Sequence, residues 1–338
     1  MEVIRGPESA SFGMGDASRV GEARRHAATL AQRTQMDEVH AGRVALIVTE
    51  LGNNLVRHAK GGVLLIALHE EQRAIEIVSI DRGPGIPDVD RSLRDGFSTG
   101  STPGTGLGAV RRLADDFHLH TAVPDGTIIV ARVRAAAAPK PQHAASVVAA
   151  GLSVALAGEI VCGDAWAIAL DGGVTSVLVA DGLGHGPDAA EASRAAVQVF
   201  AADPMAGPRA QVAAIHTGLR STRGAAVTAL QLDTGKSSIR SCGAGNVAAR
   251  VVSGNSDRTL LTQHGTAGVQ IRTPEEVTME WPPHAMLVVH SDGLESRWDP
   301  QRLMPLLRRD PMLAAAILLR DHSRGRDDST VVVLRRAD

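Results

Sequence analysis

Apolar residues recur at intervals of three and four between residues 37 and 59, where Val44, Ile47, Val48, Leu51 and Leu55 form one face. This spacing predicts an amphipathic helix. The other elements predicted before residue 134 are helices at 18–33 and 108–116 and strands at 63–69, 74–80 and 127–133. The first part of the chain is therefore predicted to pack helices on a mostly antiparallel sheet.

Strand-like apolar runs dominate the chain after residue 144, and few helices separate them. The predicted strands are 147–156, 165–170, 174–181, 226–233, 237–243, 247–253, 286–291 and 330–335, and the predicted helices are 186–203, 207–220 and 301–320. Many strands with few intervening helices are typical of a sheet sandwich flanked by helices. The whole chain is therefore predicted to be of the α+β class.

The stretch RAAAAPKPQHAA, residues 134–145, separates the two parts. It is rich in alanine, contains two prolines and shows no hydrophobic periodicity, which is typical of a linker. We therefore expect a first domain over 1–134, a linker over 135–143 and a second domain over 144–338.

The composition narrows the functional classes. With four Phe, three Trp and no Tyr, the chain has few aromatic side chains on which nucleic-acid bases could stack. Its net charge of −2 gives no basic surface that would attract phosphates, so no nucleic-acid partner is expected. Two cysteines suit a reducing compartment. The longest apolar run, 144–158, is shorter than the ~20 residues that span a bilayer, and no signal pattern begins the chain. We expect a cytoplasmic protein that does not enter the membrane.

Side chains and glycines suited to a nucleotide occur in the first part. Glu50 and Asn54 are four apart on one helix, so together they can hold a magnesium ion and orient a hydroxyl; a polar solvent face is the alternative. Asp81 ends a predicted strand in SIDRGPGI (79–86), where it can accept from an exocyclic amine while Gly83 and Gly85 let a flat ring approach. Glycines in STGSTPGTGLGAV (98–110) stand ahead of a predicted helix and can cradle phosphates.

The order ELxxNxxxHA, DxGxGI and GTGLG resembles the GHKL (Bergerat-fold) ATP-binding family, most closely its RsbT-type switch kinases and anti-sigma factors, over residues 15–134. The resemblance implies a Bergerat α/β sandwich that binds ATP and Mg²⁺, with Asn54 as magnesium ligand, Glu50 as general base and Asp81 on adenine. The glycines implied to shape the pocket and its lid are Gly83, Gly85, Gly104, Gly106 and Gly108. Thr127 matches a nucleotide-contacting threonine of the family, with an ordinary strand threonine as the alternative.

Aspartates recur beside apolar strands in the second part: Asp164, Asp181, Asp292 and the pair Asp327–Asp328. Buried carboxylates that gather together repel one another unless a cation neutralises them. Mg²⁺ or Mn²⁺ binds such clusters, and two ions about 3.5–4 Å apart can activate a water for attack on a phosphoryl group. The carbonyl of Gly182 can lend a further oxygen. For any single aspartate, capping of a turn is the alternative.

The motifs GEIVCGDAW, VADGLGHG and DDSTVVVLR resemble the SpoIIE/RsbX-type branch of the PPM phosphatases over residues 146–336. The resemblance implies a PPM-type β-sandwich flanked by helices and two Mn²⁺ or Mg²⁺ ions. The implied ligands are Asp164, Asp181, Asp292, Asp328 and the backbone of Gly182, with Asp327 either a ligand or a partner of one. His185, Arg194 and Arg326 are candidates for gripping phosphate, with surface or packing roles as alternatives, and His290 and Cys162 are interpreted as core residues.

Together, the two parts predict a bifunctional partner-switching regulator that is both a serine/threonine kinase and a metal-dependent serine/threonine phosphatase. The resemblance implies an STAS-domain antagonist or stressosome-like protein as partner, with a sigma factor or another phosphatase as alternatives, and it is compatible with a homodimer. In a second hypothesis, the first part binds ATP and a partner without phosphotransfer and regulates the phosphatase. A scaffold with two degenerate sites is the third.

Overall fold

The computed structural model describes residues 1–59, 61–94, 106–138, 146–254 and 257–337. The chain divides into two compact units, Ser9–Pro141 and a second unit made of Met1–Glu8 together with Gln142–Asp338. We expected the first eight residues to belong to the domain 1–134. They join the other unit because strand β1 (Glu2–Arg5) pairs antiparallel with β8 (Asp164–Asp171).

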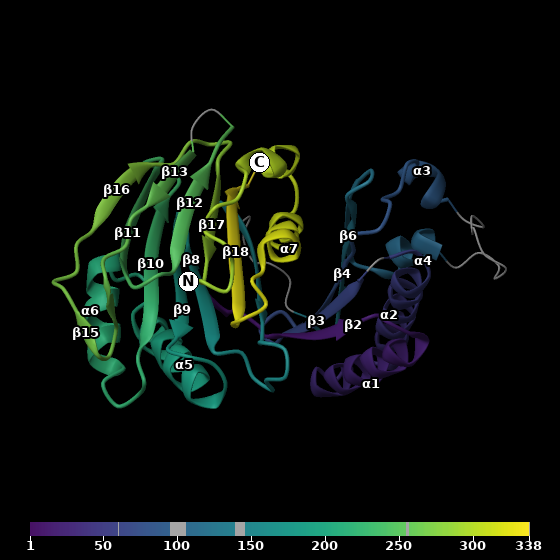
Figure 1. Ribbon diagram of the computed structural model, residues 1–338, viewed down its shortest axis with the longest axis horizontal. Coiled ribbons are helices and arrows are strands. Elements are labelled where there is room, and N and C mark those ends of the chain that lie inside the picture. The colour runs from purple at the N-terminus through teal and green to yellow at the C-terminus, as the bar shows by residue number, and fades with distance from the viewer. Residues whose placement is uncertain (60, 95–105, 139–145, 255–256, 338) are drawn as a thin grey trace. The chain divides into compact units, whose positions relative to one another are not determined.

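The unit Ser9–Pro141 is built on a five-stranded antiparallel sheet in the order β2-β3-β4-β6-β5. Its strands are β2 (Ser9–Gly13), β3 (Val63–His69), β4 (Ala74–Ile80), β5 (Asp116–Ala122) and β6 (Gly126–Arg134). Its helices are α1 (Ala17–Arg33), α2 (Glu38–His58), α3 (Val89–Ser92) and α4 (Gly106–Leu113) (Figure 1).

Helix α2 carries the two polar residues predicted to act on a nucleotide. It begins at Glu38 because the side chain of Asp37 accepts a hydrogen bond from the His40 backbone N–H at 2.9 Å. All five residues of the predicted apolar face are buried, in one core with α1, β3 and β4. Glu50 and Asn54 lie outside this buried stripe and are partly exposed.

The other unit contains two sheets, one of six strands in the order β1-β8-β9-β10-β11-β16 and one of five in the order β13-β12-β17-β18-β7, with a small sheet β14-β15. The strands after β6 are β7 (Val147–Val154), β8, β9 (Val174–Gly182), β10 (Ala225–Asp233), β11 (Ser238–Ala244), β12 (Ala248–Val252), β13 (Asp257–Leu260), β14 (Gly265–Thr266), β15 (Gln270–Ile271), β16 (Val277–Glu280), β17 (Met286–His290) and β18 (Ser329–Arg336). Buried aliphatic residues of both sheets, among them Ile168, Val177, Val289 and Val332, form a single core. The sheets therefore pack as a sandwich.

Helices cover the outer faces of this sandwich (Figure 1). Helices α5 (Pro187–Ala202) and α6 (Pro208–Gly218) pack on the six-stranded sheet, and α7 (Pro311–His322) packs on β7 and β18. The single helix predicted over 301–320 is instead a 3-10 helix, η1 (Pro300–Leu306), followed by α7. The break occurs at Pro311 because proline can begin a helix but interrupts its interior.

The architecture confirms the α+β class, with an antiparallel sheet covered by helices in one unit and a flanked sandwich in the other. The helix predicted over 108–116 ends earlier than expected, because α4 ends at Leu113 and strand β5 begins at Asp116. Among the described residues, no helix is both long enough and apolar enough to span a bilayer.

Candidate functional site

The predicted aspartates lie at the ends of neighbouring strands in the sandwich. Asp164 begins β8 and Asp181 lies near the end of β9, and the two are direct partners in the antiparallel register. Asp292 follows β17 by two residues, while Asp327 and Asp328 immediately precede β18, which pairs with β17. The first pair comes from one sheet and the other three residues from the second sheet.

Three glycines let these segments approach one another. The Gly163 N–H donates to Asp328 Oδ2 at 2.8 Å and so joins the two sheets. A Cβ on Gly163 would lie 2.6 Å from that oxygen, and a Cβ on Gly293 would lie 1.9 Å from the Asp328 carbonyl oxygen. A Cβ on Gly182 would lie 2.1 Å from the Ala189 carbonyl oxygen at the start of α5. The glycines beside the aspartates are therefore required by close backbone packing.

The carboxylates act on one another electrostatically. Burial, together with the charges of Asp164, Asp292 and Asp327, raises the pKa of Asp181 to about 9. Burial, opposed by a hydrogen bond from Ser291, raises the pKa of Asp164 to about 7, and burial also raises the pKa of Asp292. Within the described part of the chain, the buried Oδ2 of Asp164 has no hydrogen-bond partner. Concentrated negative charge and an unpaired buried oxygen fit a divalent cation.

The two adjacent aspartates before β18 have different surroundings. Asp328 is buried, and its two oxygens accept hydrogen bonds from the backbone N–H groups of Leu156 at 2.7 Å and Gly163 at 2.8 Å. The charge of Asp327 raises the pKa values of Asp164, Asp181 and Asp292, and the charge of Asp328 raises the pKa of Asp164 more than that of Asp327 does. The sequence interpretation favoured Asp328 as the ligand; both oxygens of Asp328 accept backbone hydrogen bonds here, and the choice between the two aspartates stays a prediction.

The metal-ligand assignments remain predictions. Among the residues that the structure describes, no three Asp, Glu, His or Cys side chains already surround one point as they would around a metal ion. What the structure provides is the convergence of the strand ends and the charge that this convergence concentrates.

Two polar residues at this site were missed in the sequence. Asn246, between β11 and β12, donates from Nδ2 to Asp292 Oδ2 at 2.5 Å. Arg324 lowers the pKa of Asp292 against the larger effect of burial, and its N–H bonds the Gly293 carbonyl at 2.9 Å. The available signals were an asparagine after GAG in a turn and an arginine three residues before the Asp327–Asp328 pair.

The three residues that the sequence suggested for gripping phosphate lie at the surface of the unit. His185 Nδ1 lies 2.7 Å from Glu159 Oε1, and its side chain is 53% exposed, so it lies at the surface end of this loop. Arg194 forms a 3.8 Å ion pair with Glu8, and Arg326 is exposed.

His290 and Cys162 are core residues, as interpreted. His290 is 3% exposed, its Nδ1 donates to the Ser291 carbonyl at 2.9 Å, and its Nε2 accepts from Trp298 Nε1 at 3.5 Å. The buried Cys162 thiol has a raised pKa, chiefly through burial, and is therefore a poor nucleophile.

In the unit Ser9–Pro141, Asp81 ties the end of β4 to β6. Its Oδ1 accepts from the N–H groups of Gly83 at 2.7 Å and Thr127 at 3.2 Å, and its own N–H donates to the Thr127 carbonyl. A Cβ on Gly83 would lie 2.8 Å from the His58 carbonyl oxygen, so the turn after Asp81 packs against the end of α2. The helix of Glu50 and Asn54 thus adjoins the segment of Asp81.

Thr127 is 6% exposed, and its Oγ1 lies 3.0 Å from Thr121 Oγ1 on β5. Thr121 also accepts from the Ile86 N–H at 2.8 Å, which holds the segment after Gly85. Gly85 has φ +76°, a conformation that glycine adopts readily, and its Cβ would meet the Ala122 carbonyl oxygen at 2.6 Å. Thr121 was missed in the sequence because it lies on an unpredicted strand.

The glycine-rich segment is described only in part. Gly106 begins α4 with φ +23°, and Gly108 is buried on the same helix. Gly104 lies outside the described residues.

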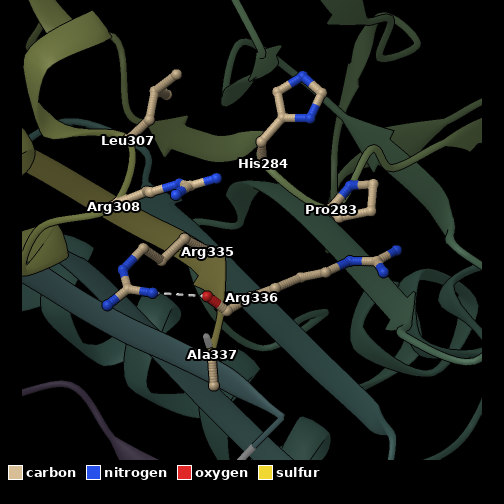
Figure 2. Close-up of a pocket in the computed structure, with 7 residues that line it drawn as sticks. All are labelled: Pro283, His284, Leu307, Arg308, Arg335, Arg336 and Ala337. Carbon is tan, nitrogen blue, oxygen red and sulfur yellow. Dashed lines mark hydrogen bonds between the residues drawn. The ribbon is translucent and has the colours of Figure 1, made fainter.

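A cavity of 410 Å³ lies at the other end of β18, eight residues or about 26 Å from Asp328. It is lined by Pro283, His284, Leu307, Arg308, Arg335, Arg336 and Ala337. Figure 2 shows the side chains of Arg335 and Arg336 extending in opposite directions from the strand. Arg336 Nη2 donates to the Trp281 carbonyl at 2.7 Å, and its guanidinium stacks on the Trp281 ring. The cationic groups do not converge on one point, so we do not assign the site here.

Comparison with known proteins matches each part of the chain to a protein family. Residues 15–133 match the family described as histidine kinase-like ATPase domain, and residues 171–337 match the family described as Stage II sporulation protein E (SpoIIE). The serine/threonine-protein kinase RsbT of Bacillus subtilis (strain 168) is 33% identical over 111 residues, which cover 32% of this chain and 84% of RsbT.

The solved structures that resemble more than half of the chain include the following two. One, from work on the bacterial stressosome as a modular system adapted to control secondary messenger signaling, is 26% identical with a TM-score of 0.53 and covers 56% of this chain and 99% of its own. RsbX in complex with magnesium is 19% identical with a TM-score of 0.52, covers 59% of this chain and 98% of its own, and supports the fold. The chain therefore belongs to the RsbT family through its N-terminal part and joins this kinase-type domain to a SpoIIE-type PPM phosphatase domain.

Proposed function

We propose that the chain is a bifunctional partner-switching regulator, in which the RsbT-like domain phosphorylates a protein and the SpoIIE-type domain removes phosphate from a serine or threonine. The observation that carries the phosphatase assignment is the convergence of Asp164, Asp181, Asp292 and Asp327 from both sheets of the sandwich. The kinase assignment is supported by the 33% identity to RsbT together with the joint presence of Glu50 and Asn54.

In the phosphatase domain, Asp164, Asp181, Asp292 and Asp327 would hold Mn²⁺ or Mg²⁺, with a further oxygen from Gly182. When bound, such ions would supply an activated water and neutralise charge on the phosphoryl group. Asn246 orients Asp292 through its hydrogen bond. Asp328, which the family resemblance implies as a ligand, would in this proposal hold the backbone at Gly163 and Leu156 through its two hydrogen bonds.

The charge of Arg324 offsets part of the negative potential at Asp292. Its position suits attraction of a phosphorylated substrate, because a cation beside an acidic cluster reduces the repulsion of an incoming phosphate. His185, exposed and paired with Glu159, would lie where a substrate enters rather than among the ligands.

In the kinase domain, Asn54 would hold Mg²⁺, and Glu50, one turn earlier on the same helix, would accept the proton of the substrate hydroxyl. Asp81 would bind the adenine amine, and its hydrogen bonds to Gly83 and Thr127 hold the carboxylate in place for this contact. The backbone N–H groups of Gly104, Gly106 and Gly108, which lie before or at the start of α4, would bind the phosphates of ATP.

The substrate that we propose is an STAS-domain antagonist or stressosome-like protein, phosphorylated by one domain and dephosphorylated by the other. A relative named as a kinase of this type and a stressosome neighbour support this choice. A homodimer is compatible with the family, and the chain is proposed to work in the cytoplasm.

The proposal is tested with labelled ATP and candidate STAS proteins. Glu50→Ala and Asn54→Ala should abolish labelling, and Asp292→Ala should leave labelling intact while stopping its removal. Glu38→Ala, twelve residues before Glu50 on the same helix, is the matched control and should label normally. If ATP binds but no partner is labelled, and ATP changes the phosphatase rate, the kinase assignment fails and the domain is a regulatory ATP-binding module.

A further inference from the structure

The N-terminal segment of the chain leads to the border of the aspartate cluster. Beyond the paired strand β1, the Gly6 N–H donates to the Trp166 carbonyl at 2.8 Å, which continues the contact with β8. A Cβ on Gly6 would lie 2.0 Å from the Trp166 indole, so only glycine lets the backbone lie against this ring. These contacts fix the path of the chain up to Glu8.

Glu8 binds the backbone immediately before Asp164. Its Oε1 accepts from the Cys162 N–H at 3.0 Å, and the next N–H, that of Gly163, donates to Asp328 Oδ2 at 2.8 Å. Two consecutive N–H groups are thus held by carboxylates from opposite ends of the chain. Because both N–H groups are held by hydrogen bonds, the path by which the chain enters β8 at Asp164 is restricted.

The charges around Glu8 agree with this position. Burial raises its pKa, while the hydrogen bond from Cys162 and the charge of Arg194 lower it, and the charge of Asp328 raises it further. Glu8 Oε2 lies 3.8 Å from Arg194 Nη2, and the Glu8 side chain is 36% exposed. Glu8 therefore lies at the edge of the cluster with its acceptor oxygen turned to Cys162.

We propose that Glu8 is a positioning residue of the phosphatase, which holds the Cys162 N–H and thereby fixes the backbone that presents Asp164 to a divalent cation. This inference rests on the metal-dependent phosphatase proposed above. The chain passes from Glu8 directly into Ser9, the first residue of β2, so the positioning residue is joined covalently to the kinase-type domain.

The test is manganese titration calorimetry on the full chain and three variants. Glu8→Ala should weaken manganese binding by about 10–100-fold, the usual effect of losing a residue that orients a metal ligand. Glu8→Gln should bind close to wild type, because its amide oxygen still accepts from Cys162. Arg194→Ala is the matched control, since it removes the other neighbour of Glu8 and leaves that hydrogen bond in place.

Thermal unfolding without metal shows whether a change in manganese affinity comes from a loss of folding stability. Glu8→Gln should unfold at the same temperature as the wild type. Unchanged manganese affinity in Glu8→Ala would overturn the inference, and so would equal weakening in Glu8→Gln, since the charge rather than the hydrogen bond would then be responsible. A wild-type chain that takes up no manganese contradicts the proposed metal site and this inference with it.

Discussion

Replacing Gly163 by alanine should damage the phosphatase site by a calculable steric conflict. The added Cβ would lie 2.6 Å from Asp328 Oδ2 and 2.8 Å from Ala189 Cβ, whereas ordinary contacts begin at 3.4 Å. These two atoms would therefore have to move away from the new methyl group by 0.8 and 0.6 Å. Asp328 is poorly able to move, because the N–H groups of Leu156 and Gly163 hold its two oxygens. Overpacking of this kind costs about 1–3 kcal/mol, and weakening a hydrogen bond to a charged group adds about 1.5–3 kcal/mol.

We therefore expect Gly163→Ala to destabilise the sandwich by about 2.5–6 kcal/mol and to weaken manganese binding by about 10–100-fold. Calorimetric titration and thermal unfolding measure the two effects. Gly173→Ala, at the other end of the β8–β9 hairpin, is the control, since its Cβ would meet only the Thr234 hydroxyl at 3.2 Å. Manganese affinity equal to wild type in Gly163→Ala, or equal loss in the control, would refute the reasoning.

Three further predictions concern other parts of the chain. Burial acts to raise the pKa of Glu76, but the charges of Arg132 and His69 outweigh it and lower that pKa from 4.5 to about 2. The ionised form of Glu76 therefore adds about 3 kcal/mol to the free energy of unfolding above pH 4.5, and this stabilisation is lost as the pH falls towards 2. The free energy of unfolding of Glu76→Gln, measured against pH, should lack this pH-dependent part. A profile like that of the wild type would contradict the reasoning. Asp81→Asn should weaken binding of fluorescent ATP by about 10-fold or more without unfolding the domain, because the amide oxygen can still accept from Gly83 and Thr127. Deleting residues 1–8 should lower phosphatase activity and manganese affinity while fluorescent-ATP binding stays intact; loss of ATP binding alone would contradict the assignment of this segment.

Local periodicity was sufficient for the elements with strong apolar patterns. The predicted strands at 63–69 and 74–80 coincide with β3 and β4, and the apolar face of α2 is buried as expected. Helix α2 buries aliphatic residues at the helical period, whereas β3 and β4 are mostly apolar runs of strand length, so in each case the sequence alone carries the signal.

Elements stabilised by distant partners could not be found in this way. Strand β1 has four residues and no buried side chain of its own, and its pairing with β8 joins positions more than 160 apart. Strand β5, DFHLHTA, buries only Leu119 and lies at the edge of its sheet, so its pattern is too polar to predict a strand. Both errors reflect tertiary pairing that outweighs local preference.

At the candidate site, the sequence supplied the residue types but not their roles. The repeated pairing of aspartate with glycine indicated the cluster, and close packing now explains the glycines at 163, 182 and 293. The roles of Asp327 and Asp328 cannot be read from their adjacent positions in the sequence, because only the fold shows that Asp328 accepts from the N–H groups of Leu156 and Gly163. Asn246 and Glu8 reach the site from distant segments, so only the fold reveals them.

The central claim is that aspartates from both sheets form one cation-dependent phosphatase centre. It is tested most directly by manganese calorimetry combined with dephosphorylation of a phosphorylated STAS protein, comparing the wild type with Asp181→Asn. The account predicts manganese uptake and manganese-dependent phosphate release by the wild type, and loss of both in the variant. Phosphate release without a divalent cation, or equal manganese affinity in the two proteins, would contradict it.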